Sequence, residues 1–529
     1  MVYPRRGRQR HARDTGSSGS PGTVSHDRPL LGGIDAGTSQ VRAFAFTPDG
    51  TPVASATAPT PTRVLGPDQA ELDAELLWET VVAVLRRMLA DLPDPKAVRG
   101  IAVASVGEAG CLLGADGRAL SPIIAWYDTR TTGELEDLLG RVGFEPLHRA
   151  TGLCADPTFS LLKLLWYQRR QPELFAQARS WLNVGDYLAY RLSGERATDV
   201  SLASRTLLLD LERRQWSKAI LDAAGLPDGL LAPLCRSGTR IGTISPAAAA
   251  ATGLAPDCAV GVGGHDHVCG LIAAGGDAPD VLFDSLGTAE ALTMVGSRPL
   301  ADSAVGWDGF NQGAFDAGTP LYYTFGGLPT AAAAVEWFRA LHGAPDHADL
   351  IAEAAAAGDR AENVLFLPHL RLGSPPFPDP VGRGAFLGIS SATDRGTLFR
   401  AVLEGVALDA GNMLKVMLRH LGGTQPARII AIGGSTRNTL LMQLKASVYG
   451  RPMAVMDLPD VTCLGAALLG GMAAGVFSDL AAARSGLRVP LRMVEPDPAW
   501  TEERRLRRQA TYAAAYAAMR PLHARLLDE

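Results

Sequence analysis

Residues 261–270, GVGGHDHVCG, place an aspartate between two histidines inside a glycine-rich run. His265 and His267 are spaced as a pair that could bind zinc, but the sequence shows no evident third ligand, with Cys269 only the nearest candidate. Asp266 could instead accept a proton from a hydroxyl group, because a carboxylate on a glycine-lined turn can stand close to a polar substrate. A turn at the end of a strand, with no chemistry, is the third interpretation. The stretch alone leaves all three open.

A second candidate is the segment 35–42, DAGTSQVR. Its Gly, Thr and Ser residues expose backbone N–H groups and hydroxyls at one point, which suits a phosphate group. Asp35 cannot contact a phosphate directly without repulsion, so we expect it to act through Mg²⁺ or through a water bound to the metal. An ordinary β-turn with a solvated aspartate is the alternative.

Two further glycine-rich turns have a related composition. Ser285–Glu290, SLGTAE, offers the same donors without the acid, and on its own it is typical of a simple turn. However, Gly37-Thr38 and Gly287-Thr288 stand in similar strand–turn–strand settings, which favours two halves built alike. Gly433-Gly434 follows a strand and precedes a helix, so the backbone there can closely approach a flat or anionic ligand. The dinucleotide fingerprint is not matched, because its third glycine and downstream acid are missing.

The segments that carry these turns alternate between strands and helices. Apolar runs flank Asp35–Ser39, and VRGIAVASVGEAG is typical of a buried strand that ends at Glu108. Between them, Asp73 is a suitable N-cap for a helix. The apolar residues at helical spacing after it are Leu77, Val81, Val84, Leu85 and Met88. This order of elements indicates an α/β architecture.

Two helices are predicted near the end of the second half. We expect Ser435 or Thr436 to cap the first and Gly450 to end it. Its expected core residues are Leu440, Leu441, Leu444 and Val448. The second, VTCLGAALLGGMAAG, has the small residues that close packing requires.

Length and charge limit the class of protein. A chain of 529 residues is too long for one core, so two or more large domains are expected. The net charge of −5 argues against nucleic-acid binding. The cysteines are scattered, as in a cytoplasmic protein with reduced thiols, and no apolar run is long enough to span a membrane. Residues 1–28 are predicted to be a disordered tail, with a tether to an anionic surface as the alternative.

In their order along the chain, these pieces resemble the FGGY family of carbohydrate kinases from about Leu30 to about Phe477. The motifs that carry the resemblance are GIDAGTSQVR, SVGEAG, WYDTRT, TFSLLKLLW, GGHDH, SLGTAE, RGAFLGIS, AVLEGVALDAGNML, GGSTRNTLLMQLKASVYGRP and VTCLGAALLGGMAAG. The resemblance implies two actin-like (ribonuclease H-like) α/β domains around a catalytic cleft that closes on sugar and ATP. The implied division is a tail (1–28), an N-terminal domain (29–257), a C-terminal domain (258–485) and a helical extension (486–529).

The resemblance also implies roles for individual residues. Asp266 would be the general base on the sugar hydroxyl, and Asp35 and Asp266 would position Mg²⁺. The residues that would hold ATP are Gly37, Thr38, Ser39, Arg42, Gly287, Thr288, Gly433, Gly434 and Asn438. The residues that would line the sugar pocket are Glu108, Trp126, Asp266 and His267.

The departures from the family pattern concentrate in the sugar pocket. Gly107-Glu108 stands where glycerol-type members have Arg-Glu and xylulose-type members have Met-His. Thr158 replaces an aromatic residue or glycine, and His267 replaces the frequent Asn or Gln. Ala332 is the nearest counterpart of a glycine that usually precedes a nucleotide-site helix. The phosphate turns keep the family pattern, so the departures bear mainly on the identity of the sugar.

We therefore expect a cytoplasmic, ATP- and Mg²⁺-dependent kinase of carbohydrate catabolism that phosphorylates a hydroxyl of a small sugar. A pentulose or hexulose is the expected acceptor, as in xylulokinase-like enzymes, and a homodimer is the expected assembly. A glycerol- or tetritol-type polyol kinase is the first alternative. The others are a non-catalytic nucleotide-binding protein on the same fold and a zinc hydrolase at His265 and His267.

Overall fold

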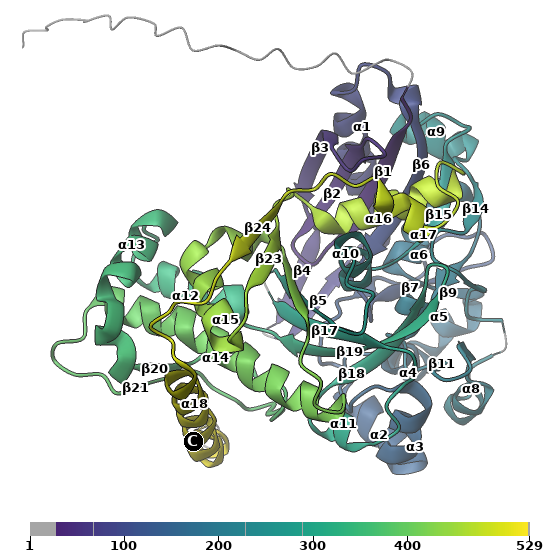
Figure 1. Ribbon diagram of the computed structural model, residues 1–529. Coiled ribbons are helices and arrows are strands. Elements are labelled where there is room, and N and C mark those ends of the chain that lie inside the picture. The colour runs from purple at the N-terminus through teal and green to yellow at the C-terminus, as the bar shows by residue number, and fades with distance from the viewer. Residues whose placement is uncertain (1–27, 67, 228, 288, 527–529) are drawn as a thin grey trace, which may run out of the picture.

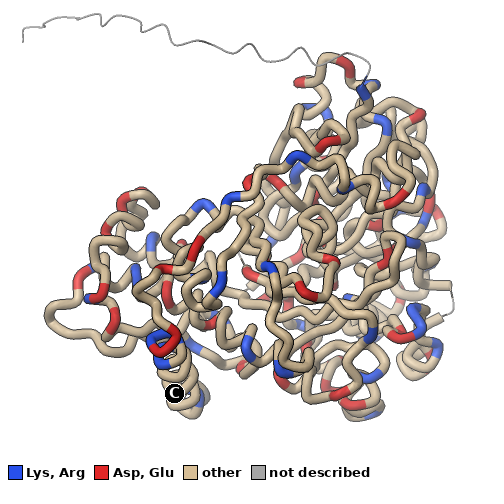
Figure 2. The backbone as a smooth tube through the Cα atoms, in the orientation of Figure 1, with Lys and Arg blue, Asp and Glu red and all other residues tan. Residues whose placement is uncertain are grey.

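The structure is a computed structural model that describes residues 28–66, 68–227, 229–287 and 289–526. The expected tail lies almost entirely outside the described residues, and so does Thr288. Figure 1 shows strands β1–β3 in one part of the molecule and helices α12–α15 in the other. Acidic and basic residues are interspersed along both parts of the backbone (Figure 2).

The N-terminal part is built on a sheet with strand order β14-β15-β6-β1-β2-β3. The bounds of these strands are β1 Leu30–Ala36, β2 Gln40–Phe46, β3 Pro52–Pro59, β6 Val98–Ser105, β14 Arg240–Thr243 and β15 Ala259–His265. The first three strands form an antiparallel meander, and β6 and β15 extend it in parallel on the β1 side. The turn between β1 and β2 therefore lies at the same edge as the carboxyl ends of β6 and β15.

The C-terminal part is built on a sheet with strand order β18-β19-β17-β16-β22-β23-β24. The bounds are β16 Val281–Leu286, β17 Glu290–Gly296, β18 Asn311–Asp316, β19 Pro320–Leu328, β22 Arg428–Ile432, β23 Met453–Met456 and β24 Leu491–Val494. Here too an antiparallel meander (β16, β17, β19) is extended in parallel, by β22 and β23. The prediction of two halves built alike is confirmed by this shared strand order.

One expectation about the division of the chain needs correction. We expected residues from 258 onward to belong to the second domain, but β15 pairs with β6 in the first sheet. Gly263 permits this pairing, because a Cβ there would lie 1.8 Å from the carbonyl oxygen of Val103. Asp266 therefore follows a strand of the first sheet. The small-residue helix α16 (Val461–Ala473) also packs on this sheet, against β1, β6 and β15.

The remaining elements surround the two sheets. The other strands are β4 Thr62–Gly66, β5 Gln69–Leu72, β7 Gly110–Leu113, β8 Ile123–Ile124, β9 Ser180–Asn183, β10 Thr198–Asp199, β11 Leu209–Asp210, β12 Gln215–Trp216, β13 Leu234–Cys235, β20 Leu365–Leu367 and β21 Ala385–Leu387. The other helices are α1 Ala74–Ala90, α2 Thr132–Val142, α3 Phe144–Thr151, α4 Ser160–Arg170, α5 Pro172–Gln177, α6 Val184–Ser193, α7 Val200–Ala203, α8 Lys218–Ala224, α9 Pro246–Thr252, α10 Asp266–Ala274, α11 Ala304–Trp307, α12 Ala331–Leu341, α13 His347–Ala357, α14 Arg395–His420, α15 Thr439–Tyr449, α17 Leu480–Ser485 and α18 Glu502–Arg525.

Helices α10 and α16 lie in a core that both sheets share. This core contains Phe44 of β2, Phe283 of β16, and the apolar side chains of both helices. Close packing depends on glycine, because a Cβ at Gly465 of α16 would lie 1.9 Å from the carbonyl oxygen of Cys269 in α10. The prediction of a closely packed small-residue helix is confirmed.

The two helix caps differ in how well they were predicted. Asp73 caps α1 and accepts a hydrogen bond from the Leu76 amide, as expected. The cap of α15 is Asn438, not Ser435 or Thr436, because a 3-10 turn over Gly434–Arg437 comes first and delays the start of the helix. Gly450 ends α15 as expected.

The helices and the cysteines bear on where the protein could be located. Among the described residues, no helix is both long and apolar enough to cross a membrane. The cysteines are free thiols, and Cys111, Cys258, Cys269 and Cys463 are buried.

Candidate active site

The first phosphate turn connects β1 to β2, directly after Asp35. The Gly37 amide donates to the carbonyl oxygen of Gln40 (3.1 Å), and the Thr60 hydroxyl donates to the carbonyl oxygen of Gly37 (2.8 Å). The indole N–H of Trp126 donates to Thr38 Oγ1 (2.8 Å). The turn is therefore braced from two other segments, and Trp126, which we expected in the sugar pocket, lies against the phosphate turn.

Two carboxylates flank a single arginine beside this turn. Arg42 Nη1 lies 3.5 Å from Asp35 Oδ2 and 3.0 Å from Asp460 Oδ2. Asp460 is the N-cap of α16, which reaches this point from the far end of the sequence. Burial raises the pKa of Asp35 well above its usual value, and Asp460 and Asp266 raise it further, while Arg42 opposes them. The surroundings of Asp35 thus carry an excess of negative charge.

Asp266 is the first residue of α10, where the chain leaves β15. Its Oδ1 accepts from the amide of His267 (2.6 Å) and lies 3.3 Å from His265 Nε2 and 4.0 Å from His267 Nε2. Burial raises the pKa of Asp266, and His267 partly opposes that rise. Burial also lowers the pKa of His265 well below its usual value, so its ring is neutral near pH 7. Both histidines therefore face one carboxylate.

Glu108 lies just beyond the carboxyl end of β6 and is 7% exposed. Its φ is +59°, in the left-handed region that a residue with a side chain adopts only under constraint. The constraint is the buried Lys163 ammonium, which donates to the carbonyl oxygens of Glu108 and Thr158, both at 2.7 Å. Glu108 contributes to the raised pKa of Asp266, so the two carboxylates face the same region. Thr158 thus contributes its carbonyl oxygen here.

The second phosphate turn connects β16 to β17. The Gly287 amide donates to the carbonyl oxygen of Ala289 (2.9 Å), which closes a tight turn. Gly433, with a φ of 103°, lies against the end of β16, because a Cβ there would be 2.4 Å from the carbonyl oxygen of Leu286. The structure thus places the expected adenosine segment beside the second turn.

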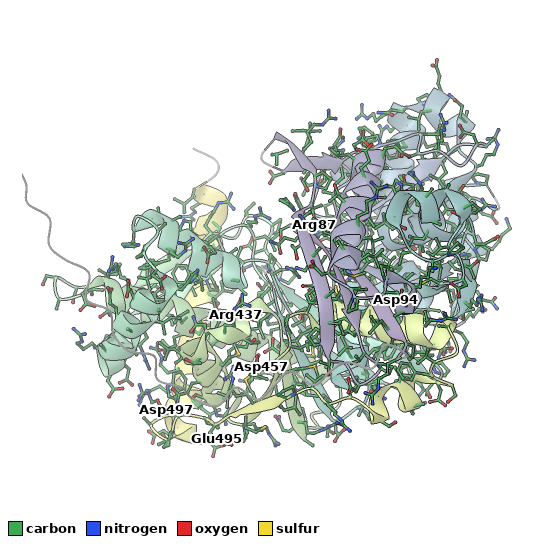
Figure 3. All side chains as sticks on the ribbon, turned by 90° about the horizontal axis from the view of Figure 1, so that it is seen from above. Arg87, Asp94, Arg437, Asp457, Glu495 and Asp497 are labelled. Atoms are coloured by element: carbon green, nitrogen blue, oxygen red, sulfur yellow. The ribbon has the colours of Figure 1, made fainter. Side chains whose placement is uncertain are left out.

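The expected adenosine segment is exposed on the C-terminal part of the molecule. Gly433 and Gly434 are exposed, and the side-chain Oδ1 of Asn438 caps α15 by accepting from the Leu441 amide (3.0 Å). Arg437 ends the 3-10 turn that follows Gly433. Figure 3 shows Arg437 on the C-terminal part of the molecule and Arg87 of α1 on the N-terminal part.

A buried charge cluster fixes the second turn to α15. Lys445 lies 3.0 Å from Asp284 Oδ2 and also pairs with Glu290, and the Tyr449 hydroxyl donates to Asp284 Oδ2 (3.0 Å). Asp284 is on β16 and Glu290 begins β17, so the cluster holds both arms of the hairpin. None of these roles was predicted, because a buried lysine on a helix gives no sequence signal of its distant partners.

Arg205 and Asp460 were not among the predicted site residues. Arg205 follows α7 and pairs with Glu108, and Asp460 pairs with Arg42. Both reach the site from elements far from their partners in sequence. Thr288, an expected phosphate contact, lies outside the described residues.

No group of three or more His, Cys, Asp and Glu side chains within the described ranges is arranged to hold a metal ion. The two histidines of the opening motif instead converge on Asp266. This geometry favours the acid–base interpretation of the motif over the zinc interpretation.

Comparison with known proteins agrees with this geometry. The N-terminal domain of the FGGY family of carbohydrate kinases matches residues 30–273, and its C-terminal domain matches residues 282–474. An L-fuculokinase of Escherichia coli O157:H7 is 30% identical over 89% of this chain and 98% of the relative. A xylulose kinase of Escherichia coli K12 is 32% identical over 84% of this chain and 90% of the relative.

A ligand-bound xylulose kinase from Lactobacillus acidophilus has the same fold. Its TM-score is 0.85 at 22% identity, covering 94% of this chain and 100% of that one. The predicted fold class, two actin-like α/β domains, is confirmed.

Proposed function

Because the chain belongs to the FGGY family of carbohydrate kinases, we propose that its phosphoryl acceptor is a small ketose, a pentulose or a hexulose, and that Asp266 is the general base. The relatives named as fuculokinase and xylulose kinase support a ketose. The phosphoryl donor is ATP. We also propose a cytoplasmic location, supported by the free cysteines, and a homodimer, which stays a prediction.

The observation that carries the role of Asp266 is its position among polar groups that converge on it. Oδ1 accepts from the His267 amide and lies 3.3 Å from His265 Nε2, which leaves the other carboxylate oxygen for the substrate hydroxyl. Asp266 accepts the hydroxyl proton as the hydroxyl oxygen bonds to the terminal phosphorus of ATP and the bond from that phosphorus to ADP breaks. Because phosphoryl transfer has a loose transition state, positioning and charge neutralisation supply most of the rate enhancement.

The residues around Asp35 fit a magnesium ion. Asp35 Oδ1 is buried and has no hydrogen-bond partner among the described residues. Asp35 and Asp460 share Arg42, and the Asp266 carboxylate adds a further negative charge near Asp35, so a divalent cation would offset the excess of negative charge. Mg²⁺ is commonly held by one or two carboxylates together with water and phosphate oxygens. We propose that Asp35 and Asp266 hold it, and that when bound it neutralises charge on the transferred phosphate.

The nucleotide would lie between the two turns. The backbone amides of Thr38 and Ser39 face phosphate in this proposal. Gly37 and Gly287 let their turns approach the phosphates closely, because their own amides close the turns, and Thr288 is a predicted further contact. The closeness of Gly433 to Leu286 supports an adenosine site next to the second turn. Arg42 pairs with Asp35 and Asp460 and thereby helps to position Asp35 in this proposal. A direct contact between Arg42 and ATP stays a prediction.

A polyol kinase is the second candidate, and Glu108 favours it. A carboxylate at the pocket can accept hydrogen bonds from the hydroxyls of a linear polyol. Values of kcat/KM measured side by side on xylulose, fuculose, rhamnulose, erythritol and glycerol would separate the candidates. A preference for erythritol or glycerol would replace the ketose assignment.

The proposed base is tested by Asp266→Asn. We expect kcat to fall by about 10³–10⁴-fold with little change in nucleotide affinity, because the amide cannot accept the proton. Asp186→Asn is the matched control: Asp186 is 5% exposed and lies outside the site, and burial raises its pKa to about 8, so the amide reproduces its protonated form. Substantial turnover by Asp266→Asn would remove Asp266 from the mechanism.

A further inference from the structure

Arg205 is a buried side chain beside the proposed base that none of the roles above uses. It is 5% exposed and follows α7. Its Nε lies 2.5 Å from Glu108 Oε1, and Nη2 reaches the same oxygen. The guanidinium therefore approaches Glu108 with one edge and leaves the other edge, which carries Nη1, for another partner.

Gly107 provides the space that Arg205 occupies. A Cβ at position 107 would lie 2.8 Å from Cγ and 3.1 Å from Cβ of Arg205, and 3.2 Å from Cδ2 of His265. Gly107 does not have a positive φ, so the backbone itself would accept alanine. The glycine is thus required for the arginine, and any side chain at 107 would move it.

Two aromatic rings place Arg205 between the two parts of the molecule. Its Cζ lies 5.4 Å from the ring centroid of Phe159, just before α4, and 5.4 Å from that of Phe325, on β19. The Phe325 ring is also 5.3 Å from the ring of His267. Arg205, Glu108 and the histidines around Asp266 therefore line one region, between the two sheets.

The Nη1 atom of Arg205 is buried and has no hydrogen-bond partner within the described part of the chain. Buried polar groups in folded proteins are nearly always paired. The Tyr323 hydroxyl beside Arg205 is also buried and without a hydrogen-bond partner among the described residues, so two polar groups in this region call for a further partner. The oxygen of a bound ligand meets that need. The Arg205–Glu108 pair is neutral overall, and the Asp266 charge beside it disfavours an anionic acceptor.

We propose that Arg205 is a specificity-determining residue that donates Nη1–H to one oxygen of the phosphoryl acceptor, while Glu108 accepts from a neighbouring hydroxyl. The acceptor class this selects is a neutral, polyhydroxylated molecule with adjacent oxygens. A site built to hydrogen-bond a hydroxyl strongly rejects an analogue that lacks it, since the buried groups are then left unpaired. The inference rests on the proposed kinase function at the same site.

The experiment starts with ADP release by the wild-type protein on neutral ketoses and polyols and on gluconate. Turnover of no carbohydrate would overturn the proposed function, and this inference with it. Preference for gluconate would overturn only the inferred acceptor class. For the best neutral acceptor, the deoxy analogues are then compared in wild-type protein, Arg205→Lys and Arg205→Gln.

We expect both variants to lower acceptor kcat/KM by about 100-fold while the KM for ATP stays within about two-fold. Wild-type protein should reject one deoxy analogue strongly, and that discrimination should collapse in Arg205→Gln. Equal losses toward acceptor and ATP, or unchanged discrimination, would show that Arg205 has only a structural role.

Two further variants keep the test sharp. Arg508→Lys changes an equally buried Arg–Glu pair outside the site and should leave acceptor and ATP kinetics unchanged. Gly107→Ala displaces Arg205 without removing it and should raise acceptor KM by about 10-fold, with Gly140→Ala, in open space on α2, as its control. A Gly107→Ala protein with wild-type acceptor KM would also overturn the proposal, even if the Arg205 variants failed to fold.

Discussion

Two buried arginine–glutamate pairs in this molecule share one local geometry. Arg205 meets Glu108 at the proposed sugar pocket, and Arg508 of α18 meets Glu404 of α14. In each pair, Nε and Nη2 both reach the Oε1 atom, and both side chains are less than 10% exposed. By residue type, burial and pairing the two cannot be told apart.

They differ in whether the arginine is fully used. Arg508 Nη1 donates to the carbonyl oxygen of Glu362 (2.6 Å), and its Nη2 also lies 3.4 Å from that of Val364. Arg205 Nη1 makes no such hydrogen bond, and the Tyr323 hydroxyl beside Arg205 is itself without a partner among the described residues. A buried donor without an acceptor costs about 1–3 kcal/mol of folding free energy. The fully bonded Arg508 holds α18 against α14, whereas Arg205, which is not fully bonded, lies where the sugar is expected to bind.

The largest expected effect comes from breaking each pair and then removing it altogether. Arg508→Met should lower the free energy of unfolding by about 3–5 kcal/mol, because it leaves a buried carboxylate unpaired, and adding Glu404→Met should restore most of it. In the pocket, Arg205→Met should likewise lower the free energy of unfolding, and adding Glu108→Met should restore most of it. Acceptor kcat/KM should nevertheless remain at least about 100-fold below that of wild-type protein.

Urea denaturation of the two single and two double variants measures the free energy of unfolding, and steady-state kinetics on the same variants measures acceptor kcat/KM. If the doubly substituted pocket regained turnover along with stability, the two pairs would be equivalent and the contrast between them would be lost.

Much of this contrast lies beyond sequence analysis. Asp35, Asp266 and the two glycine turns were predicted because each depends on short-range order: a strand, a turn and the next element. Arg205 was missed, because its partner is fixed only when α7 packs near the end of β6. Asp460 was missed for the same reason, since α16 reaches Arg42 from the other end of the chain.

The sheet to which β15 belongs could not be read from the sequence either. A buried strand looks the same whichever sheet it joins, and here a close approach at Gly263 decides the pairing. Glycine 107 was noted as a departure from the family pattern. That it makes room for an arginine from another element required the structure.

A second difference lies in how each glutamate is held. Glu404 sits within helix α14, whereas Glu108 has a left-handed backbone supported by Lys163. Burial lowers the pKa of Lys163 to about 7, although Glu108 and Asp128 oppose that shift. A neutral amine still has two N–H groups for its two carbonyl acceptors.

The lowered pKa of Lys163 predicts a pH-dependent stability. Between pH 7 and the unfolded pKa of 10.5, the unfolded chain binds the proton that the folded chain has released, so stability rises with pH. We expect wild-type protein to gain about 2 kcal/mol relative to Lys163→Met between pH 7 and pH 9, since the slope is at most about 1.4 kcal/mol per pH unit. Urea midpoints at the two pH values measure this gain. The exposed Lys96→Met is the control, and a difference independent of pH would mean that Lys163 stays charged when folded.

The smallest expected effect separates the two pairs by electrostatics alone. Burial raises the pKa of Asp266, Glu108 raises it further, and Arg205 opposes them. Since a general base must be ionised, kcat/KM should fall as the pH drops through that raised pKa. Arg205→Gln should therefore move the acidic limb to higher pH and Glu108→Gln should move it to lower pH. Arg508→Gln and Glu404→Gln should leave the limb in place, because their pair is remote from Asp266. If the acidic limb shifted equally for variants of both pairs, the cause would be a general effect on the fold. Only opposite shifts that are confined to the pocket pair would place Arg205 and Glu108 within electrostatic reach of Asp266.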